Sequence, residues 1–447
     1  MGRHRTSRED LRERIRRRRL TVGVLGMGYV GLPLALEYAR AGIRTFGFDI
    51  KPEKISQLQQ GQSYIRDVPT AALAEQVQTG RLIPTGDFRH CADCDVLFIC
   101  VPTPFTAHKD PDISFILQAT ESIAATLRPG QLIVLKSTTF PGTTEEYVLP
   151  LLQRTGLQVG EDFFLAFSPE RVDPGNRVWT TANTPVVVGG VTERCTELAV
   201  AALELVVQKV VPVRNPRVAE MAKLLENIFR SVNIALVNEM AQLCDRLGVN
   251  IWEVIEAAST KPFGFMPFYP GPGIGGHCIL IDPYYLAWVA RRYDFVTNFV
   301  TLAAEVNESM PFYVRGLIER EIARLPVSLE RARVLFLGVA FKRDVDDLRH
   351  SPALKIMELL WHDGVRQLAY YDPYIRSVEF LGRRLESMPE LTPTLLRQQH
   401  IVVITTDHSG VDYEMVCRWS RVVIDTRNAC RHVRRSRARV VLLGSGR

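Results

Sequence analysis

The sequence predicts an α/β protein with two doubly wound parallel sheets, joined by a central helical domain that contains one long helix. Short apolar, β-branched runs alternate with helical segments at both ends of the 447-residue chain. Residues 213–310 lack such runs, and their apolar residues recur at three- and four-residue steps. A hydrophobic content of 46% and a charged content of 23% are typical of a globular protein with sizeable cores.

The first sheet is predicted from a strand, a turn and a helix near the start of the chain. The apolar run LTVGVLG at 20–26 ends in glycine, residues 32–41 have helical character, and residues 45–49 form a second strand candidate. Strands that alternate with helices form a parallel sheet covered by those helices. Further buried strands are expected at 95–101, 131–136 and 163–167.

The middle of the chain predicts the long helix. Segment 217–247 carries apolar residues at helical spacing, contains no proline, and ends before Gly248. A helix of this length would span about 45 Å. Such a helix can bridge two domains and pack against a second copy of the chain, so we expect a homodimer.

The alternation of strands and helices resumes in the last third of the chain. Strand candidates at 333–341, 368–372, 401–406 and 421–426 predict a second open sheet. Gly338 is not followed by further glycines at the spacing that binds dinucleotides, so we expect no dinucleotide site in this half.

The first nineteen residues form a basic segment. Residues 3–19 contain nine arginines and three acidic residues. We expect a solvated, mobile arm here, because charge runs at a terminus commonly face water. The alternative, binding of nucleic acid or of an anionic membrane, is the less favoured interpretation. No secretory signal and no long apolar segment occur, so we expect a cytoplasmic protein with neither nucleic-acid nor membrane partners.

Eight irregularly placed cysteines do not form a disulfide framework, so reduced thiols are expected. Cys91 and Cys94 form one CxxC pair, but a structural zinc site needs four ligands and no second pair matches. We expect these two residues to be buried beside the strand at 95–101 and expect no metal site.

A glycine motif predicts the cofactor. The segment GMGYVG contains the GxGxxG pattern between the first strand and the first helix, where glycines let the backbone approach a pyrophosphate at the helix N-terminus. The alternative is a purely structural glycine turn. The residues assigned to the cofactor are Gly26, Gly28, Tyr29, Val30 and Gly31.

The residues after the second strand favour NAD over NADP. Asp49 ends that strand, where a carboxylate can accept hydrogen bonds from ribose hydroxyls and repel a 2′-phosphate. Lys51 and Lys54 keep NADP open, because a nearby cation can accommodate that phosphate.

A cysteine beside glycines predicts covalent chemistry. In GPGIGGHC at 271–278, Gly275 and Gly276 stand just before Cys278. A thiolate can attack an aldehyde, and exposed backbone N–H groups can stabilise the resulting oxyanion. Taken alone, however, a cysteine is more often a small buried hydrophobic residue.

Polar side chains elsewhere could assist this cysteine. Lys223 and Asn227 lie four residues apart on the predicted long helix, so they share a face. A lysine buried among apolar groups can have a lowered pKa and act as a base or oxyanion stabiliser. Glu170 follows a strand, at the edge where open α/β sheets bind ligands. The competing interpretations are a solvated helix face and a turn with a surface glutamate.

Taken together, these segments resemble the UDP-glucose/GDP-mannose dehydrogenase family. The resemblance spans residues from about 20 to 430 in seven ordered motifs: GMGYVGLPLA, VPTP at 101–104, LKSTTFPGTT at 135–144, FSPER at 167–171, EMAKLLEN at 220–227, GPGIGGHC at 271–278 and GVAFKRDVDDLRHSP at 338–352. It implies two Rossmann-like domains and a central dimerisation domain. The expected boundaries are a basic arm at 1–19, an NAD-binding domain at 20–212, the helical domain at 213–325 and a nucleotide-sugar domain at 326–447.

The resemblance also implies roles for individual residues. Cys278 is similar to the family's nucleophile, and Lys223, Asn227 and Asp282 are similar to the groups that manage protons and the oxyanion. Glu170 resembles the carboxylate assigned to thioester hydrolysis, and Thr138 resembles a hydroxyl that holds a catalytic water. Cofactor contacts are implied for Lys54, Thr103 and Arg349. Substrate contacts are implied for Glu170, Arg171, Lys223, Asn227, Lys261, Tyr269, Gly275, His277 and Lys342.

Departures from the family pattern bear on the substrate. His277 and Ile281 stand where UDP-glucose enzymes typically carry serine and lysine, and Pro174 stands where some carry a second glutamate. The segments HCILIDPYYL and SPERVDPGN resemble the branch that acts on UDP-N-acetylhexosamines, especially UDP-N-acetylglucosamine, in bacterial surface-polysaccharide synthesis. Lys261 lies one residue from the usual position of an arginine that reaches the substrate across the dimer.

The resemblance implies a four-electron oxidation of the sugar C6 hydroxymethyl group, with NAD as cofactor and a Cys278 thioester as intermediate. Alternatives are a UDP-glucose or GDP-mannose 6-dehydrogenase, a two-electron 3-hydroxyacid-type dehydrogenase, or a non-catalytic NAD-binding regulator. The 3-hydroxyacid type has no use for Cys278 or for a second α/β domain, and a regulator would have lost the catalytic residues.

Overall fold

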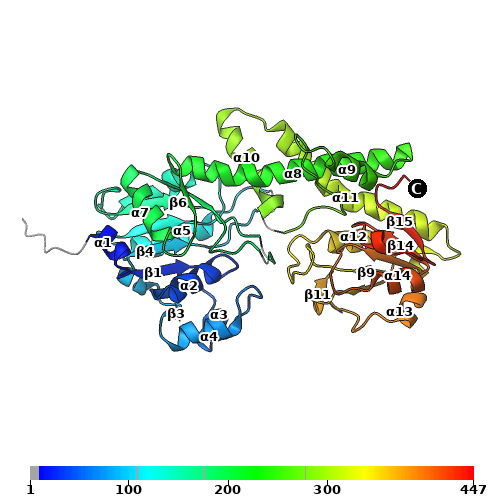
Figure 1. Ribbon diagram of the computed structural model, residues 1–447, viewed down its shortest axis with the longest axis horizontal. Coiled ribbons are helices and arrows are strands. Elements are labelled where there is room, and N and C mark those ends of the chain that lie inside the picture. The colour runs from blue at the N-terminus through cyan, green and yellow to red at the C-terminus, as the bar shows by residue number, and fades with distance from the viewer. Residues whose placement is uncertain (1–9, 107–108, 174, 177, 277, 447) are drawn as a thin grey trace, which may run out of the picture. The chain divides into compact units, whose positions relative to one another are not determined.

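The computed structural model describes residues 10–106, 109–173, 175–176, 178–276 and 278–446, with the backbone alone at Cys278. It divides into two compact units, the first comprising Met1–Glu226 and Tyr284–Phe295 and the second Asn227–Pro283 and Val296–Arg447 (Figure 1). Each unit contains one main sheet. None of the described helices combines the length and the apolar character needed to cross a membrane.

The first unit is built on an eight-stranded sheet in the order β3-β2-β1-β4-β5-β6-β7-β8. Neighbouring strands are parallel except β6 and β7, which pair antiparallel through Phe167 and Gly189. The predicted doubly wound sheet is thus confirmed, with one antiparallel pair that the sequence did not predict. The strands are β1 (Thr21–Leu25), β2 (Arg44–Phe48), β3 (Leu82–Thr85), β4 (Val96–Ile99), β5 (Leu132–Leu135), β6 (Phe164–Phe167), β7 (Val186–Gly190) and β8 (Val210–Pro212).

Alternate residues of each central strand enter two different cores. On β4, Val96 and Phe98 join the core that contains residues of α1, α2 and α7, whereas Leu97 and Ile99 join the core that contains residues of α5 and α6. This alternation is why the strands are apolar throughout. The helices are α1 (Leu11–Arg16), α2 (Gly31–Arg40), α3 (Pro52–Gln59), α4 (Thr70–Gln78), α5 (Ser114–Ala124), α6 (Leu149–Gln153) and α7 (Glu193–Leu203), with short turns η1 (Phe88–Asp93) and η2 (Thr144–Val148).

The expectation of a solvated basic arm is wrong for residues 11–16. These residues form α1, and its two apolar side chains, Leu11 and Ile15, are buried in the first core. Arg14 pairs with Asp95, which also accepts a hydrogen bond from the backbone N–H of Thr21 at 3.0 Å. This segment docks on the sheet through Leu11 and Ile15, which lie four residues apart on one helix face, and through the ion pair of Arg14 with the buried Asp95.

The second unit contains a parallel five-stranded sheet in the order β10-β9-β13-β14-β15. Its strands also serve two cores: Val334 and Phe336 of β9 pack with α11 and α12, whereas Leu335 and Leu337 pack with α13 and α14. The strands are β9 (Arg333–Leu337), β10 (Gln367–Tyr371), β13 (Ile401–Ile404), β14 (Val422–Asp425) and β15 (Arg439–Leu442), with a hairpin of β11 (Ser377–Phe380) and β12 (Arg383–Glu386). The helices are α9 (Ile251–Ser259), α11 (Asn298–Ala323), α12 (Pro352–His362), α13 (Pro393–Gln398) and α14 (Tyr413–Trp419).

Two helices contribute to both units. Helix α8 (Pro216–Leu247) has 32 residues, which confirms the long helix predicted over 217–247 (Figure 1). Helix α10 (Cys278–Ala290) begins directly after the glycine-rich segment 271–276 and contains Pro283. The central helices therefore carry most of the residues that the sequence assigned to chemistry.

Candidate active site

The glycine loop between β1 and α2 has the geometry of a dinucleotide site. Gly26 has φ +94°, and a Cβ on it would lie 2.5 Å from the carbonyl oxygen of Cys100. A Cβ on Gly31 would lie 1.9 Å from the carbonyl oxygen of Gly26. At Gly28, by contrast, a Cβ would meet no atom within 4 Å. Two glycines thus permit close packing of the loop, and the third leaves open space where a pyrophosphate can approach the backbone.

Asp49 is fixed beside this loop, directly after β2. Its carboxylate accepts hydrogen bonds from the backbone N–H groups of Met27 and Lys51, each at 3.0 Å. The Lys54 ammonium lies 3.3 Å from the same carboxylate. Asp49 is therefore held where ribose hydroxyls of a dinucleotide can bind, and Lys54 already has an anionic partner.

The carboxyl ends of neighbouring strands bring three of the predicted residues to one edge of the first sheet. Thr103 follows β4, Thr138 follows β5 and Glu170 follows β6, and these three strands are adjacent. Thr103 is buried, and its carbonyl accepts a hydrogen bond from the Tyr285 hydroxyl at 2.6 Å. This edge is where open α/β sheets bind their ligands.

Glu170 is not a surface glutamate. Its side chain is 13% exposed. One carboxylate oxygen accepts hydrogen bonds from the backbone N–H groups of Arg171 and Val172, at 2.9 and 3.0 Å. The Arg171 guanidinium pairs with Glu226 and donates to the carbonyl of Pro185 at 2.9 Å. The predicted acid is thus partly buried and oriented by its own backbone.

Lys223 and Asn227 do not form a solvated helix face. Both side chains belong to residues that are only 8% exposed. In the second unit, the Asn227 amide donates a hydrogen bond to the Asp282 carboxylate at 2.5 Å, and Asp282 is 1% exposed. Asp282 lies one helical turn after Cys278 on α10. Asn227 and Asp282, which are 55 positions apart in the sequence, are therefore hydrogen-bonded one helical turn from Cys278, the predicted nucleophile.

The glycine-rich segment before Cys278 packs on the loop that follows β9. A Cβ on Gly275 would lie 2.6 Å from Phe341 and 2.9 Å from the carbonyl oxygen of His350. Gly276, with φ +84°, donates its N–H to the carbonyl of Arg349 at 2.8 Å. The fold thus unites two predicted motifs, GPGIGGHC and GVAFKRDVDDLRHSP. Lys342 is partly buried on this loop, and Arg349 pairs with Asp347 at 2.7 Å.

Other predicted substrate residues lie on the central segment of the second unit. Tyr269 stacks on Trp252, with ring centroids 5.8 Å apart. Lys261 is exposed, and its ammonium lies 5.0 Å from the centroid of the Phe263 ring. His277 and Pro174 lie outside the described residues.

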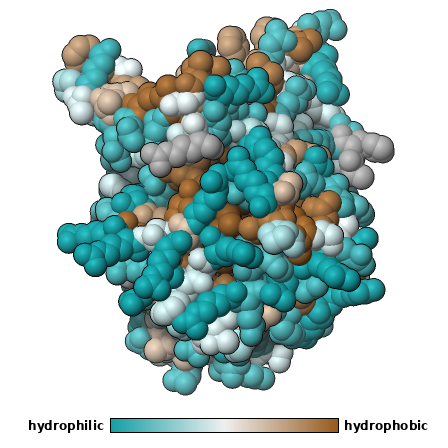
Figure 2. Space-filling view, turned by 90° about the vertical axis from the view of Figure 1, so that its right-hand side faces the viewer, coloured by the Kyte–Doolittle hydropathy of each residue, from teal (hydrophilic) through white to brown (hydrophobic). Residues whose placement is uncertain are grey.

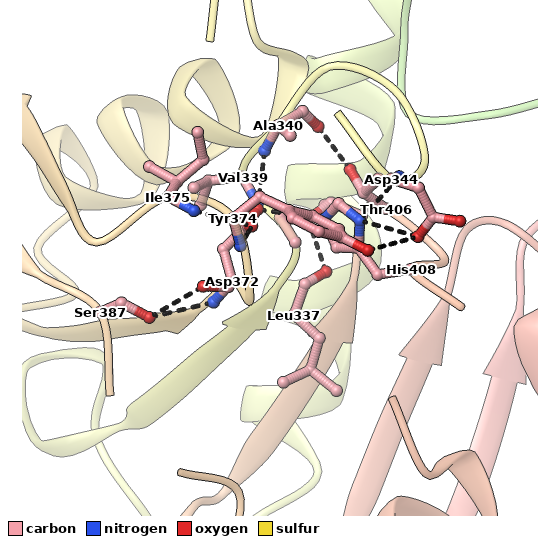
Figure 3. A network of polar contacts seen from close by, with 12 residues as sticks. Leu337, Val339, Ala340, Asp344, Asp372, Tyr374, Ile375, Ser387, Thr406 and His408 are labelled. Carbon is pink, nitrogen blue, oxygen red and sulfur yellow. Dashed lines mark hydrogen bonds and ion pairs between the residues drawn. The ribbon is translucent and has the colours of Figure 1, made fainter. Parts of the chain in front are cut away.

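A buried polar network holds the loop after β9 (Figure 3). Asp372, directly after β10, accepts hydrogen bonds from the N–H groups of Val339 and Ala340 at 2.8 and 3.0 Å. The His408 Nδ1 accepts from the Asp344 N–H at 3.0 Å, which leaves Nε2–H to donate to Asp372 at 3.1 Å. Burial by itself raises the pKa of Asp372, but these hydrogen bonds and the histidine lower it overall.

This network and two further residues, Lys136 and Arg427, were not predicted from the sequence. The Lys136 ammonium lies 3.6 Å from the Glu170 carboxylate. The Arg427 guanidinium packs against Gly271, where a Cβ on the glycine would lie 2.5 Å from it. A charged residue that ends the apolar run LIVLK was a usable signal for Lys136. Arg427 follows an ordinary buried strand, and nothing local in the sequence distinguishes it.

Comparison with known proteins finds three matches to one family along the chain. Residues 20–206 match the NAD-binding domain of the UDP-glucose/GDP-mannose dehydrogenase family, residues 217–309 its central domain, and residues 335–432 its UDP-binding domain.

Individual relatives extend over nearly the whole chain. The UDP-N-acetyl-D-mannosamine dehydrogenase of Pyrococcus horikoshii is 36% identical over 92% of this chain and 96% of its own length. The UDP-N-acetyl-D-glucosamine 6-dehydrogenase of Pseudomonas aeruginosa is 36% identical over 80% of this chain and 83% of its own length. The solved structure of the Pyrococcus horikoshii enzyme superposes with a TM-score of 0.86 at 33% identity, covering 96% of this chain and 100% of that one.

The fold, the glycine loop and these matches define an NAD-dependent nucleotide-sugar dehydrogenase. The chain belongs to the UDP-glucose/GDP-mannose dehydrogenase family, and its substrate is a UDP-sugar.

Proposed function

We propose that this enzyme oxidises the C6 hydroxymethyl group of a UDP-N-acetylhexosamine to a carboxylate, with Cys278 carrying the intermediate. The observation that supports this most directly is the buried hydrogen bond between Asn227 and Asp282, one turn after Cys278. Bound NAD accepts a hydride in each of the two oxidations. A cysteine is needed because a second hydride can leave an aldehyde only after a nucleophile has added to it.

The proposed roles of the residues follow from their positions and chemistry. Lys223, Asn227 and Asp282 handle the C6 hydroxyl proton and stabilise the negative charge that develops on that oxygen. The Cys278 thiolate adds to the aldehyde to give a thiohemiacetal, and its oxidation leaves a thioester. Water then adds to the thioester carbon and the C–S bond breaks. We assign the proton of that water to Glu170 and its placement to Thr138.

Within this class we propose UDP-N-acetylglucosamine as the substrate. The segments around Cys278 and Glu170 resemble that branch, and the Pseudomonas aeruginosa relative bears the corresponding name. UDP-N-acetylmannosamine is the second candidate, because the Pyrococcus horikoshii relative is named for it. The two sugars differ in one configuration at C2, which depends on pocket geometry.

The stoichiometry of NADH tests the proposal. We expect two NADH per UDP-N-acetylhexosamine consumed by the wild-type enzyme, with less turnover on UDP-glucose and GDP-mannose. Cys278→Ser is expected to lose the second oxidation, whereas Cys91→Ala, a control change at a cysteine in the core of the first unit, retains the stoichiometry. One NADH per sugar, unchanged in Cys278→Ser, would restore a two-electron dehydrogenase.

We also propose a homodimer formed through α8. Its buried face carries polar residues, among them Glu220, Lys223, Asn227 and Asn238. Large apolar residues are exposed on another part of the helix, at three- and four-residue steps from Val218 to Phe229 and again from Leu236 to Leu247. This apolar stripe comprises Val218, Met221, Leu225, Phe229, Leu236, Met240, Leu243 and Leu247. A contiguous exposed apolar surface is typical of a protein interface, and a second copy is the partner that supplies an identical stripe.

Hydrophobic side chains also interrupt the hydrophilic surface of the face drawn in Figure 2, mostly in its upper half.

We further propose that residues 20–212, 213–325 and 326–447 act as the NAD-binding, helical and nucleotide-sugar domains. A cytoplasmic location is proposed from the free state of the described cysteines.

A further inference from the structure

Lys136 is a buried lysine that the proposed mechanism does not use. It follows β5 directly and is 2% exposed. Its ammonium lies 3.4 Å from the carbonyl oxygen of Ser168, to which it donates, and 3.6 Å from the second carboxylate oxygen of Glu170. Lysine is almost never fully buried unless it is paired, because an isolated buried charge is costly. The burial of Lys136 therefore depends on Glu170.

Glu170 is held from two sides. Its first carboxylate oxygen accepts the backbone N–H groups of Arg171 and Val172, and its second faces Lys136. The backbone bonds hold the first oxygen, and Lys136 places a positive charge beside the second.

Two other ionisable groups belong to residues near this pair, Arg171 and Cys100. The Arg171 guanidinium is engaged by Glu226. The Cys100 thiol follows β4, and burial raises its pKa to about 12. At neutral pH it carries no charge and does not compete for the ammonium. Lys136 and Glu170 therefore form a cation–carboxylate pair at the ligand-binding edge of the first sheet.

We infer that Lys136 is a positioning residue for the hydrolytic step, whose ammonium holds the second carboxylate oxygen of Glu170 in the orientation that receives a proton from the attacking water. This inference rests on the proposed function. The water oxygen bonds to the thioester carbon while one water proton passes to Glu170. The C–S bond then breaks and Cys278 leaves as a thiolate. This step transfers one proton, from water to Glu170, and neither an oxidant nor a reductant takes part.

The substitution Lys136→Met removes the charge at similar length. Without the ammonium, the second carboxylate oxygen of Glu170 loses the partner that faces it and is held less well in the direction of the attacking water. We expect kcat to fall about 10- to 100-fold, with a much smaller change in KM. Lys136→Arg keeps the charge and is expected to restore much of the rate.

The experiment compares full-length wild type, Lys136→Met, Lys136→Gln, Lys136→Arg and Glu170→Gln, with the exposed Lys209→Met as matched control. Lys136→Gln keeps a donor for the Ser168 carbonyl without the charge, and it replaces the methionine variant if that variant does not fold. NAD affinity checks folding, kcat and KM are measured separately, and intact-protein mass spectrometry of quenched reactions measures the acyl adduct on Cys278.

Accumulation of the adduct in Lys136→Met or Lys136→Gln, a loss in kcat without a matching change in KM, and rescue by arginine would support the inference. Adduct in Glu170→Gln but none in the uncharged Lys136 variants would overturn it and leave the proposed function standing. If no variant forms an adduct and Cys278→Ser turns over fully, the proposed function itself fails.

Discussion

Single atoms decide whether the loop between β1 and α2 can form. Gly31 must lack a side chain because a Cβ there would lie 1.9 Å from the carbonyl oxygen of Gly26, far inside van der Waals contact. Gly28 has no such neighbour, so its lack of a side chain has a different cause. We attribute it to the bound cofactor, which must approach the backbone closely.

The two glycines therefore give opposite results when each is changed to alanine. Gly28→Ala is expected to leave the melting temperature without NAD unchanged but to weaken NAD binding by about tenfold or more, which is about 1.4 kcal/mol. Gly31→Ala is expected to lower both the melting temperature and the affinity for NAD, because the loop itself must shift. Calorimetric titration with NAD and thermal unfolding measure the two effects. If Gly28→Ala bound NAD as tightly as the wild type, the open space beside Gly28 would not be where the cofactor binds.

At the scale of elements, loops that follow strands are fixed by residues from other strands. The loop after β9 carries Lys342, and it is held by Asp372 after β10 and His408 after β13. This anchoring orders a loop that the proposed function places on the substrate. Its stability should depend on the ionisation of Asp372, because the accepted hydrogen bonds favour the charged form.

Asp372→Asn is expected to lower the free energy of unfolding by about 2 kcal/mol at neutral pH. The pKa of Asp372 is lowered in the folded protein. The stabilisation that the Asp372 carboxylate contributes is therefore fully present above its pKa of about 3.9 in the unfolded chain. It is lost as the pH falls through the lower pKa of the folded protein. Urea unfolding at several pH values should show the difference between wild type and variant shrinking below about pH 4. The exposed Glu379→Gln serves as control, and a difference that does not change with pH would contradict the assignment.

At the scale of the whole molecule, α8 carries an exposed apolar stripe, while polar residues such as Lys223 and Asn227 are buried beside apolar ones such as Leu224. A helix on the surface of a monomer exposes polar residues in place of such a stripe. It is consistent with a helix that presents catalytic side chains to its own chain and an apolar surface to a second copy.

The double variant Leu236→Arg, Leu243→Arg is expected to be monomeric, because charges would be placed in the centre of the apolar stripe. Arg230→Glu changes an exposed charge on the same helix outside the stripe and should leave the association state unchanged. Sedimentation velocity over a range of concentrations measures both. A wild-type monomer, or a double variant that still dimerises, would contradict the proposed interface.

Much of the fold could be predicted because its signals are local. The central strands β1, β4, β5 and β6 are apolar runs, and α8 has an uninterrupted helical period. Strands β3, β7, β8 and β15 of the two main sheets were not predicted. The edge strands β3 and β8 each contain a proline, which edge strands tolerate and central strands do not. Helix α1 was missed because a short arginine-rich segment resembles a solvated terminus until its two apolar residues meet a core.

The sequence by itself determined the residue types: the glycine loop, the acid after the second strand, the cysteine and the family motifs. Only the tertiary structure decided their partners, such as Asn227 with Asp282 and Lys136 with Glu170. The physical reason is that periodicity and glycine spacing are properties of neighbouring residues. The burial and pairing of a charge, in contrast, depend on chain segments that meet only when the protein folds.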